Sequence, residues 1–375
     1  MANTLQQFLE SGGFLALENP ALDPIDVDLL VRQLPELDDH CLFRTSGTEG
    51  EPKFVALSRD ALFASAKSVN ERFGVGSEDR WLCALPKFHV GGFGIYARAH
   101  IAENEVVELQ KWEPDVFNKT VVREAISMTS LVPTQLFDLV IRQLKAPETL
   151  RYAIIGGGAL NPEIALRARA LGWPIVETYG MTETGSMVAA TSDCESGKEG
   201  RLKFLDGWEG INDDDSLTLK LRGEGLFAGY VSQSDGVFEF DSPKDADGWF
   251  TTSDRVEVDS GGLRFIGRLG AEVKVLGELV DLDRLQQRVS SEAESLGVDP
   301  NHLIVVALAD ERSGNRIVLA DASGSNDGQS VVDHVNVGLA GYERITEALP
   351  VVEIPRGSLG KPLRRKLRLL LERQL

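Results

Sequence analysis

The feature that most constrains the fold is a regular alternation of short apolar runs with helical segments between residues 41 and about 190. The apolar runs WLCALP, SMTSLVP, RYAIIGG and PIVETYG each have the length of a buried strand. Between them lie GGFGIYARAHIA, TQLFDLVIRQLK and NPEIALRARALG, whose apolar residues recur with helical spacing. Such alternation predicts an α/β fold, a sheet covered by helices, with ligands bound at the carboxyl ends of the strands.

The pattern changes twice after this region. Residues 200–267 contain short strand-like runs between acidic or glycine turns, such as SLTLKLRGEG and RVEVDSGGLRFIG, which predicts a β-rich subdomain. From residue 268 strands and helices are mixed, and a basic amphipathic helix ends the sequence. We therefore expect a large domain over residues 1–267 and a small α+β domain over residues 268–375.

Composition restricts the partners and the compartment. The 375 residues include 58 acidic and 39 basic side chains, and the net charge of -19 argues against nucleic acid or an anionic membrane as a partner. No apolar stretch reaches the ~18 residues that cross a bilayer. The three cysteines lie far apart and without C-x-x-C spacing, which indicates neither a disulfide framework nor a zinc site. We expect a cytoplasmic protein that acts on small molecules, with monomer and homodimer both open.

A long polar turn in LFRTSGTEGEPKFVALS separates two short apolar strands, at residues 41–43 and 54–57. Glycines let backbone amides converge, and hydroxyl groups with a lysine add further donors, which is the chemistry of an oxyanion cradle. When the loop is taken alone, an ordinary solvated glycine and serine turn is the better explanation of it. The candidate phosphate ligands are Thr45, Ser46, Gly47, Thr48, Gly50 and Lys53.

A run of three glycines, Gly156, Gly157 and Gly158, ends the strand YAII. A flat ligand such as a purine ring could approach the backbone there. A tight strand-to-helix turn, capped by Asn161 with Pro162 in the first helical position, explains the same residues.

The segment ETYGMTETGSM places Glu183 among three threonine hydroxyls just after an apolar strand. Its carboxylate could hold Mg²⁺ while Thr178, Thr182 and Thr184 meet phosphate, with Tyr179 alongside. A solvated loop charge is the alternative.

Two charged groups stand out toward the C-terminus. Asp254 and Arg268 frame one hairpin, where they could form a surface salt bridge or grip the hydroxyls of a ribose. Lys361 lies in a glycine-flanked loop, IPRGSLGKPL, before the terminal helix. Seven basic residues and one acidic residue follow Pro355, a concentration that a solvated helix face also explains.

Taken in order, these stretches resemble the adenylate-forming superfamily of acyl-CoA synthetases, luciferases and adenylation domains. TSGTEGEPK is similar to its phosphate loop, LPKFHVGG to its Pro-x-x-His segment, YGMTE to its magnesium motif, TSD and GR to its ribose contacts, and PRGSLGK to its terminal lysine loop. The resemblance covers residues 42–365. Among subfamilies, LPKFHVGGFGI and SLVPTQLFDLV are most like the o-succinylbenzoate-CoA ligases of menaquinone biosynthesis.

The resemblance implies ATP, Mg²⁺ and CoA as ligands and a small carboxylic acid as substrate. The acid would attack the α-phosphorus of ATP to give an acyl-adenylate, and CoA would then take the acyl group as a thioester. It also implies the roles of single residues. Residues 45–53 would bind the β- and γ-phosphates of ATP, Thr182 the α-phosphate, and Glu183 the Mg²⁺ ion. The nucleotide would contact Gly156–Gly158, Tyr179 and Gly180, and its ribose would contact Asp254 and Arg268. Lys361 would bridge the carboxylate and the phosphate, and Lys274 and Gly277 would guide the thiol.

His89 is expected near the acyl pocket, with Gly91, Gly92 and Phe93 shaping a slot for an aromatic acid; an ordinary buried histidine is the alternative. Because the phosphate loop begins near residue 45, we expect a shortened N-terminal subdomain. The resemblance further implies that the small C-terminal domain is mobile, with a hinge near residues 268–270 where Gly270 stands. Glu49 adds a negative charge to the phosphate loop. Three other functions stay open: a ligase for another aryl or fatty acid, an enzyme that loads a carrier-protein thiol, and an inactive nucleotide-binding module.

Overall fold

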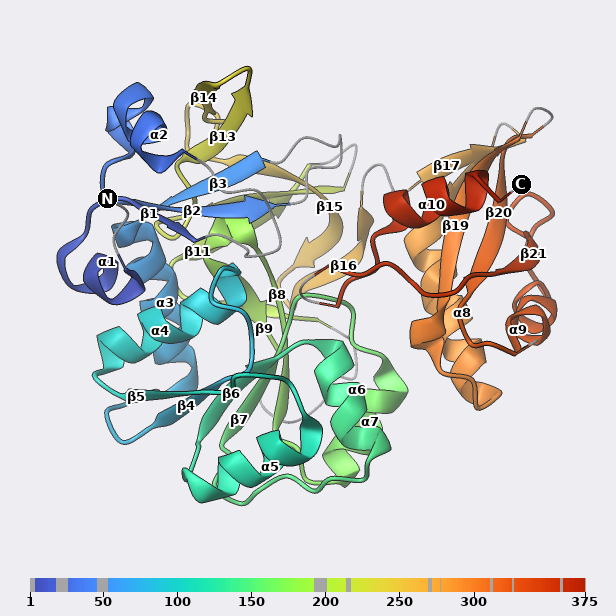
Figure 1. Cartoon of the computed structure of the whole chain (residues 1–375), viewed down its shortest axis with the longest axis horizontal. Coiled ribbons are helices and arrows are strands. Elements are labelled where there is room, and N and C mark those ends of the chain that lie inside the picture. Colours follow the sequence, from blue (N-terminus) through green and yellow to red (C-terminus); the bar gives the residue numbers. More distant parts are fainter. Residues whose placement is uncertain are drawn as a thin grey trace. The chain divides into compact units, whose positions relative to one another are not determined.

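The structure is a computed structural model that describes residues 4–17, 26–45, 53–191, 201–213, 217–268, 272–276, 278–310, 313–325, 327–357 and 360–374. The chain divides into two compact units. The first comprises Met1–Asp213, Leu219–Thr252 and Val258–Arg264, and the second comprises Asp214–Thr218, Ser253–Glu257 and Phe265–Leu375. The second unit is therefore built mainly from the C-terminal part of the sequence (Figure 1).

The largest sheet of the first unit has seven strands within the described residues, in the order β10-β9-β8-β7-β6-β4-β5. Strands β5, β4, β6, β7 and β8 are parallel, and β9 and β10 add antiparallel at one edge, which confirms the predicted α/β fold. The strands are β4 (Arg80–Cys83), β5 (Glu105–Glu108), β6 (Met128–Leu131), β7 (Tyr152–Ile155), β8 (Ile175–Met181), β9 (Ser186–Ala190) and β10 (Lys203–Phe204).

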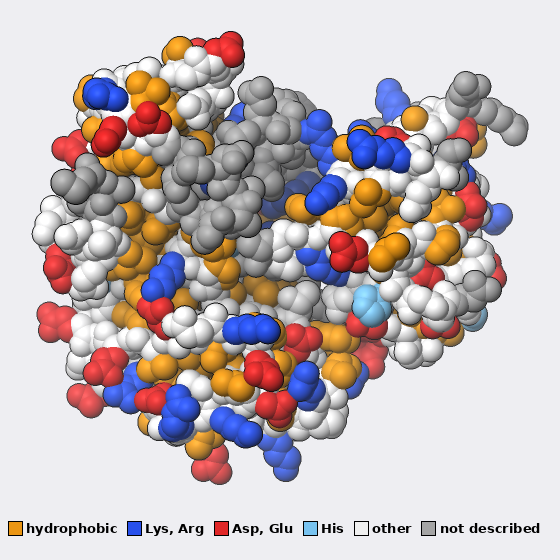
Figure 2. Space-filling view, viewed as in Figure 1, with side chains coloured by type: hydrophobic (Ala, Val, Ile, Leu, Met, Phe, Trp, Pro, Cys, Tyr) orange, Lys and Arg blue, Asp and Glu red, His pale blue; other side chains and the backbone are white. Residues whose placement is uncertain are grey.

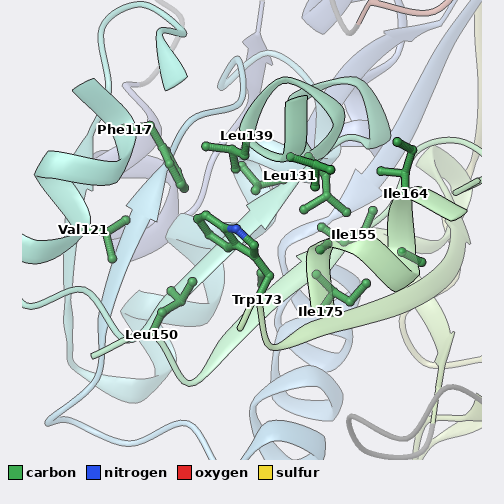
Figure 3. Close-up of a cluster of buried hydrophobic side chains, with 14 of the residues drawn as sticks. Phe117, Val121, Leu131, Leu139, Leu150, Ile155, Ile164, Trp173 and Ile175 are labelled. Carbon is green, nitrogen blue, oxygen red and sulfur yellow. The ribbon is translucent and has the colours of Figure 1, made fainter. Parts of the chain in front are cut away.

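Helices cover both faces of this sheet. Helices α5 (Pro114–Arg123), α6 (Pro133–Ile141) and α7 (Pro162–Ala170) bury their apolar sides around Trp173, as Figure 3 shows. Helix α4 (Val90–Ala102) links β4 to β5, and it packs against α3 (Arg59–Phe73). The connection from β4 to β5 runs toward one edge of the sheet, whereas the connections from β6 to β7 and from β7 to β8 run toward the other edge. Because such crossovers are right-handed, α4 lies on the face opposite α6 and α7. The reversal between β4 and β6 is a topological switch point, where ligands of such folds bind.

A second sheet of the first unit contains the predicted hairpin. Its order is β1-β2-β3-β13-β14, and β2 and β3 pair antiparallel as expected. Its strands are β1 (Leu15–Leu17), β2 (His40–Thr45), β3 (Lys53–Ser58), β13 (Gly229–Ser234) and β14 (Val237–Asp241). The helices α1 (Leu5–Ser11) and α2 (Val27–Gln33) and the 3₁₀ turn η1 (Pro35–Leu37) belong to the same N-terminal part of the chain.

A four-stranded sheet has the order β11-β12-β15-β16. Its strands are β11 (Trp208–Asn212), β12 (Thr218–Gly223), β15 (Phe250–Asp259) and β16 (Gly262–Arg268). Residues 200–267 are thus rich in strands, as predicted, but the strands serve three sheets: β10 extends the seven-stranded sheet, and β13 and β14 pair with the hairpin.

The second unit contains a three-stranded sheet in the order β19-β20-β21 with a helix layer on each face. Along β19 (Leu303–Asp310), Leu303, Val305 and Ala307 pack in the cluster that contains α8 and α9, and the alternate residues pack against α10. The other elements are β17 (Glu272–Val275), β18 (Glu278–Asp281), α8 (Leu282–Ser295), the 3₁₀ turn η3 (Pro300–His302), β20 (Gly314–Asp321), α9 (Asp327–Val335), β21 (Ile345–Pro350) and α10 (Arg364–Glu372).

Candidate active site

The β2–β3 hairpin delivers both ends of the predicted phosphate loop. Its last pair joins Thr45 to Lys53, whose side chain is exposed at the start of β3. The loop residues Ser46, Gly47, Thr48 and Gly50 lie outside the described residues, as does the side chain of Thr45. The strands that carry the loop are therefore established, and its phosphate-binding role stays a prediction.

The glycine run Gly156–Gly158 forms the turn between β7 and α7 at the carboxyl edge of the seven-stranded sheet. Gly157 has a φ of +82° that favours glycine, and a Cβ on Gly156 would lie 2.7 Å from Oγ1 of Thr178. The predicted cap is also present, since Oδ1 of Asn161 accepts from the amide of Glu163 at 2.7 Å. The turn thus has a structural reason for its glycines, while its exposed backbone keeps the predicted nucleotide contact open.

The neighbouring strand β8 ends in a hairpin that brings the predicted magnesium motif to the same edge. Between β8 and β9 lies the 3₁₀ turn η2 (Thr182–Thr184), closed by Gly185 in the left-handed region. A Cβ on Gly180 would lie 1.8 Å from the carbonyl oxygen of Ser186, so only glycine allows this close approach of the two strands. Tyr179 is buried and pairs with Ala189 of β9. Nucleotide contacts of Tyr179 and Gly180 stay predictions.

Two of the three threonines expected to meet phosphate are engaged within the protein instead. The Thr184 hydroxyl is buried, accepts from the amide of Met181 at 3.2 Å and lies 2.9 Å from the carbonyl oxygen of Ser186. The Thr178 hydroxyl donates to the carbonyl oxygen of Ile155 at 3.0 Å. Their expected phosphate contacts are therefore wrong, because these hydroxyls close the turn and join β8 to β7. Thr182, at the start of η2, stays a candidate.

Glu183 is held in place by the segment around β13. The hydroxyl of Tyr230 donates to Oε1 of Glu183 at 2.9 Å, and the amide of Phe227 donates to the Glu183 carbonyl oxygen at 2.8 Å. Burial and then the negative charge of Glu183 raise the pKa of Tyr230, so its hydroxyl keeps its proton. Glu183 is thus a fixed carboxylate rather than a freely solvated one. Tyr230 was not among the predicted residues, because its partner is distant in the sequence.

The Pro-x-x-His segment follows β4, at the switch point of the sheet. His89 precedes the first residue of α4 and is half-buried, with its ring against Phe88 at 4.8 Å between centroids, so it is not a core histidine. A Cβ on Gly92 would lie 2.3 Å from the carbonyl oxygen of Pro86, which explains that glycine. The expectation that Phe93 shapes a slot is wrong: its ring is fully buried against Phe43 at 5.3 Å.

Arg98 is a functional candidate that the sequence-based predictions missed. Its side chain is 1% exposed, donates to Oγ of Ser186 at 2.6 Å and lies 3.5 Å from Oγ of Ser130. No carboxylate within the described part of the chain pairs with it, and burial lowers its pKa to about 10. A buried cation without an anion is costly and uncommon. The available signal was an arginine within the apolar helix GGFGIYARAHIA.

In the second unit, Asp254 and Arg268 form the ion pair expected of one hairpin. Nε of Arg268 lies 2.7 Å from Oδ1 of Asp254, and the Asp254 side chain is 3% exposed. Loss of hydration and then the charge of Arg268 lower the pKa of Lys361, whereas the charge of Asp254 raises it. The three side chains are therefore electrostatic neighbours. Ribose binding by Asp254 and Arg268 stays a prediction.

The Lys361 loop is closed by backbone contacts before the basic helix α10. The amide of Gly357 donates to the Lys361 carbonyl oxygen at 2.8 Å, and Nη1 of Arg356 donates to that of Gly360 at 2.6 Å. In α10, Leu367 and Leu371 are buried in the second unit, whereas Arg365, Lys366 and Arg368 are exposed. Figure 2 shows Lys and Arg side chains at the surface of this unit. Leu370 of the same helix is 38% exposed.

Lys274, predicted to guide the thiol, lies in β17 with an exposed side chain. Its strand is tied to β20, because Nδ2 of Asn315 donates to the Lys274 carbonyl oxygen at 2.9 Å. Gly270 of the expected hinge and Gly277 lie outside the described residues. The hinge and the thiol-guiding role stay predictions.

Known proteins place this arrangement in a family. A family model described as AMP-binding enzyme matches residues 17–208. The chain belongs to the AMP-binding enzyme family. This confirms the resemblance to the adenylate-forming superfamily. Within the described residues, no helix is both long and apolar enough to cross a membrane.

Curated and solved AMP-binding enzymes match most of the chain. The 2-succinylbenzoate–CoA ligase of Bacillus cytotoxicus is 27% identical over 342 residues, which are 88% of this chain and 69% of that relative. The structure of E. coli MenE with bound OSB-AMS is 26% identical with a TM-score of 0.70, covering 89% of this chain and 69% of that one. The structure of the o-succinylbenzoate coenzyme A synthetase of Bacillus subtilis, in complex with ATP and magnesium ion, is 25% identical with a TM-score of 0.75. The match covers 97% of this chain and 81% of that one.

Proposed function

We propose that this protein is a 2-succinylbenzoate–CoA ligase of menaquinone biosynthesis, which forms an acyl-adenylate from ATP and then a thioester with CoA. The observation that carries the proposal is the Glu183 carboxylate, held by Tyr230 beside the exposed glycine turn after β7. A fixed carboxylate and an exposed glycine turn therefore follow neighbouring parallel strands, at the edge where such folds bind ligands. The relatives named above supply the substrate class.

The residues of the first unit fit a magnesium–nucleotide complex. Mg²⁺ is usually bound by one or two carboxylates together with substrate phosphates, and Glu183 offers an oriented carboxylate. When bound, Mg²⁺ would neutralise negative charge on the phosphates during adenylation. Thr182, next to Glu183, would donate to the α-phosphate, and Lys53 with the loop before it would contact the outer phosphates.

The second unit would contribute the cation for the adenylation step. A carboxylate is a poor acyl donor until it is joined to phosphate, and negative charge grows as its oxygen attacks the α-phosphorus. We assign Lys361 to that charge, and Asp254 with Arg268 to the ribose. Loss of hydration and the charge of Arg268 lower the pKa of Lys361 from its ordinary value. Lys274 would then act in transfer of the acyl group to CoA.

The buried guanidinium of Arg98 supports an acid with a second carboxylate. Arg98 lies beside Ser186, which directly follows the η2 turn and Gly185, so the cation adjoins the predicted magnesium motif. A 2-succinylbenzoate molecule carries two carboxylates, of which only one is activated. We infer that the other approaches Arg98, where it would supply the anion that the described side chains lack.

We further propose a cytoplasmic location and small-molecule partners. Cys41 and Cys83 are buried and unbridged, as in a reducing compartment, and the net charge of -19 disfavours nucleic acid. A homodimer is a proposal for light scattering to test.

The deciding experiment measures pyrophosphate release with a panel of acids, with and without CoA. We expect 2-succinylbenzoate to support the fastest release, and CoA to be consumed in equal amount as thioester. Faster turnover of another aryl or fatty acid would assign a different acyl-CoA ligase. Adenylate that accumulates without reacting with free CoA would indicate a carrier-protein thiol as acceptor, and ATP binding without pyrophosphate release would indicate an inactive module. Glu183→Gln serves as the control for background hydrolysis.

A further inference from the structure

The carboxylate of Glu183 is oriented by a side chain that belongs to none of the predicted motifs. Tyr230 lies in β13, in a different sheet from the strand β8 that leads to Glu183. Its hydroxyl donates to Oε1 at 2.9 Å. Among the described residues no donor reaches Oε2. One carboxylate oxygen is therefore held by the protein, and the other is left for a cation.

The backbone and the side chain of Glu183 are fixed by different groups. The backbone of η2 is held by the Phe227 amide at 2.8 Å and by Oγ of Ser65, which donates to the carbonyl oxygen of Thr184 at 3.1 Å. Neither contact restrains the rotatable bonds of the glutamate side chain, whose ordering costs conformational entropy. In the described structure that restraint comes from Tyr230 alone.

The strand of Tyr230 also borders the strand that carries Lys53. In the β13–β3 pairing, Tyr230 is opposite Val55, and Lys53 lies two residues before Val55. Because side chains alternate along a strand, Tyr230, Val55 and Lys53 project from the same face of the sheet. The Glu183 carboxylate is thereby fixed on the face that presents the lysine at the end of the predicted phosphate loop.

We propose that Tyr230 is a positioning residue for the divalent cation: it holds Oε1 of Glu183 so that Oε2 is presented to a metal ion bound with the nucleotide phosphates. The inference rests on the proposed function, since it takes Glu183 as the magnesium ligand. Groups that hydrogen-bond a metal ligand set its orientation, and their removal typically weakens metal affinity by about 10- to 100-fold. Because Tyr230 contributes a single neutral hydrogen-bond donor, we expect a loss of metal affinity at the lower end of that range.

The test uses the whole chain and measures metal binding directly. Tyr230→Phe removes the hydroxyl and keeps the ring, which packs on Phe227 with 4.9 Å between centroids. Mn²⁺ replaces Mg²⁺, α,β-methylene-ATP replaces ATP because it is not cleaved between the α- and β-phosphorus atoms, and the electron paramagnetic resonance signal of free Mn²⁺ gives the bound fraction. Tyr152→Phe is the matched control, since this half-buried ring packs on Phe73 at the amino end of β7.

We expect Tyr230→Phe to bind Mn²⁺ about 10-fold more weakly in the nucleotide complex, and adenylation to recover at high Mg²⁺. Tyr152→Phe should match the wild type, and Glu183→Gln should lose more affinity than either. Wild-type affinity in Tyr230→Phe together with a loss in Glu183→Gln would overturn the positioning role and leave the proposed function intact. Wild-type affinity in Glu183→Gln would overturn both.

Discussion

Replacing Arg98 by methionine separates a binding role from a structural one. Burial lowers the pKa of Arg98 from 12.5 to about 10, so the charged form costs the folded state about 3 kcal/mol. The substitution removes this cost together with the hydrogen bond to Ser186 at 2.6 Å. A hydrogen bond to a charged group is worth about 1.5–3 kcal/mol. Because the two terms oppose each other, we expect the free energy of unfolding to change by less than about 1.5 kcal/mol.

Activity should respond very differently. Removing one partner of a buried charge pair costs at least about 2 kcal/mol, which is a loss of at least ~30-fold in kcat/KM for 2-succinylbenzoate. The loss should be small for 3-benzoylpropionate, an analogue that lacks the ring carboxylate. Pyrophosphate release with each acid measures both values, and urea unfolding gives the stability.

The matched control is Arg222→Met. Arg222 is an accessible arginine that pairs with Glu209 at 2.8 Å and lies over the ring of Trp249 at 4.6 Å. We expect little change in either readout, since exposed ion pairs contribute little. Equal losses of activity for the two acids in Arg98→Met would refute the carboxylate contact. A large loss of stability with normal turnover would show that Arg98 serves the fold alone.

Three further predictions concern single residues. Lys361→Ala should lower adenylate formation by at least ~10²-fold and leave thioester formation from a synthetic adenylate unchanged. Single-turnover assays measure both steps, and adenylation within a few-fold of wild type would show that Lys361 has no role in it. As the pH rises, adenylation should fall at a pH below the ordinary lysine pKa of 10.5, because the reaction needs the charged form of Lys361. Asp254→Asn should move this fall to still lower pH, since Asp254 raises the pKa of Lys361. An unchanged pH profile of kcat at saturating ATP would contradict this prediction. Gly180→Ala should destabilise the first unit by more than ~2 kcal/mol in urea unfolding, since its Cβ would meet the Ser186 carbonyl oxygen at 1.8 Å; an unchanged midpoint would mean that the hairpin can shift.

The elements of the seven-stranded sheet could be predicted from the sequence because their signals are local. The runs around β6, β7 and β8 have strand length, and α6 and α7 show helical spacing with proline in their first turns. The caps and the glycine turn after β7 follow from the same short-range chemistry. Parallel order and crossover hand then place the loops at one edge.

Long-range pairings could not be predicted in this way. Strand β13 reads as one more strand of a β-rich stretch, yet it pairs with β3, so that Tyr230 is opposite Val55. Nothing near Tyr230 in the sequence points to Glu183, because the contact depends on how two sheets meet. The same limit explains Phe93 and Thr184, whose side chains turn into the protein although their neighbours in the sequence are candidates for the site.

The two-faced sheet of the second unit has a consequence for how the protein is made on the ribosome. The apolar face of β19 formed by Ile304, Val306 and Leu308 is covered by α10, which is synthesised only after β20, α9 and β21. Until α10 has been synthesised, that apolar face of the nascent chain is uncovered, so chaperones can bind to it and other unfolded chains can aggregate with it. The loop of Lys361 lies immediately before α10, so docking of this helix closes the unit and anchors the loop in one event.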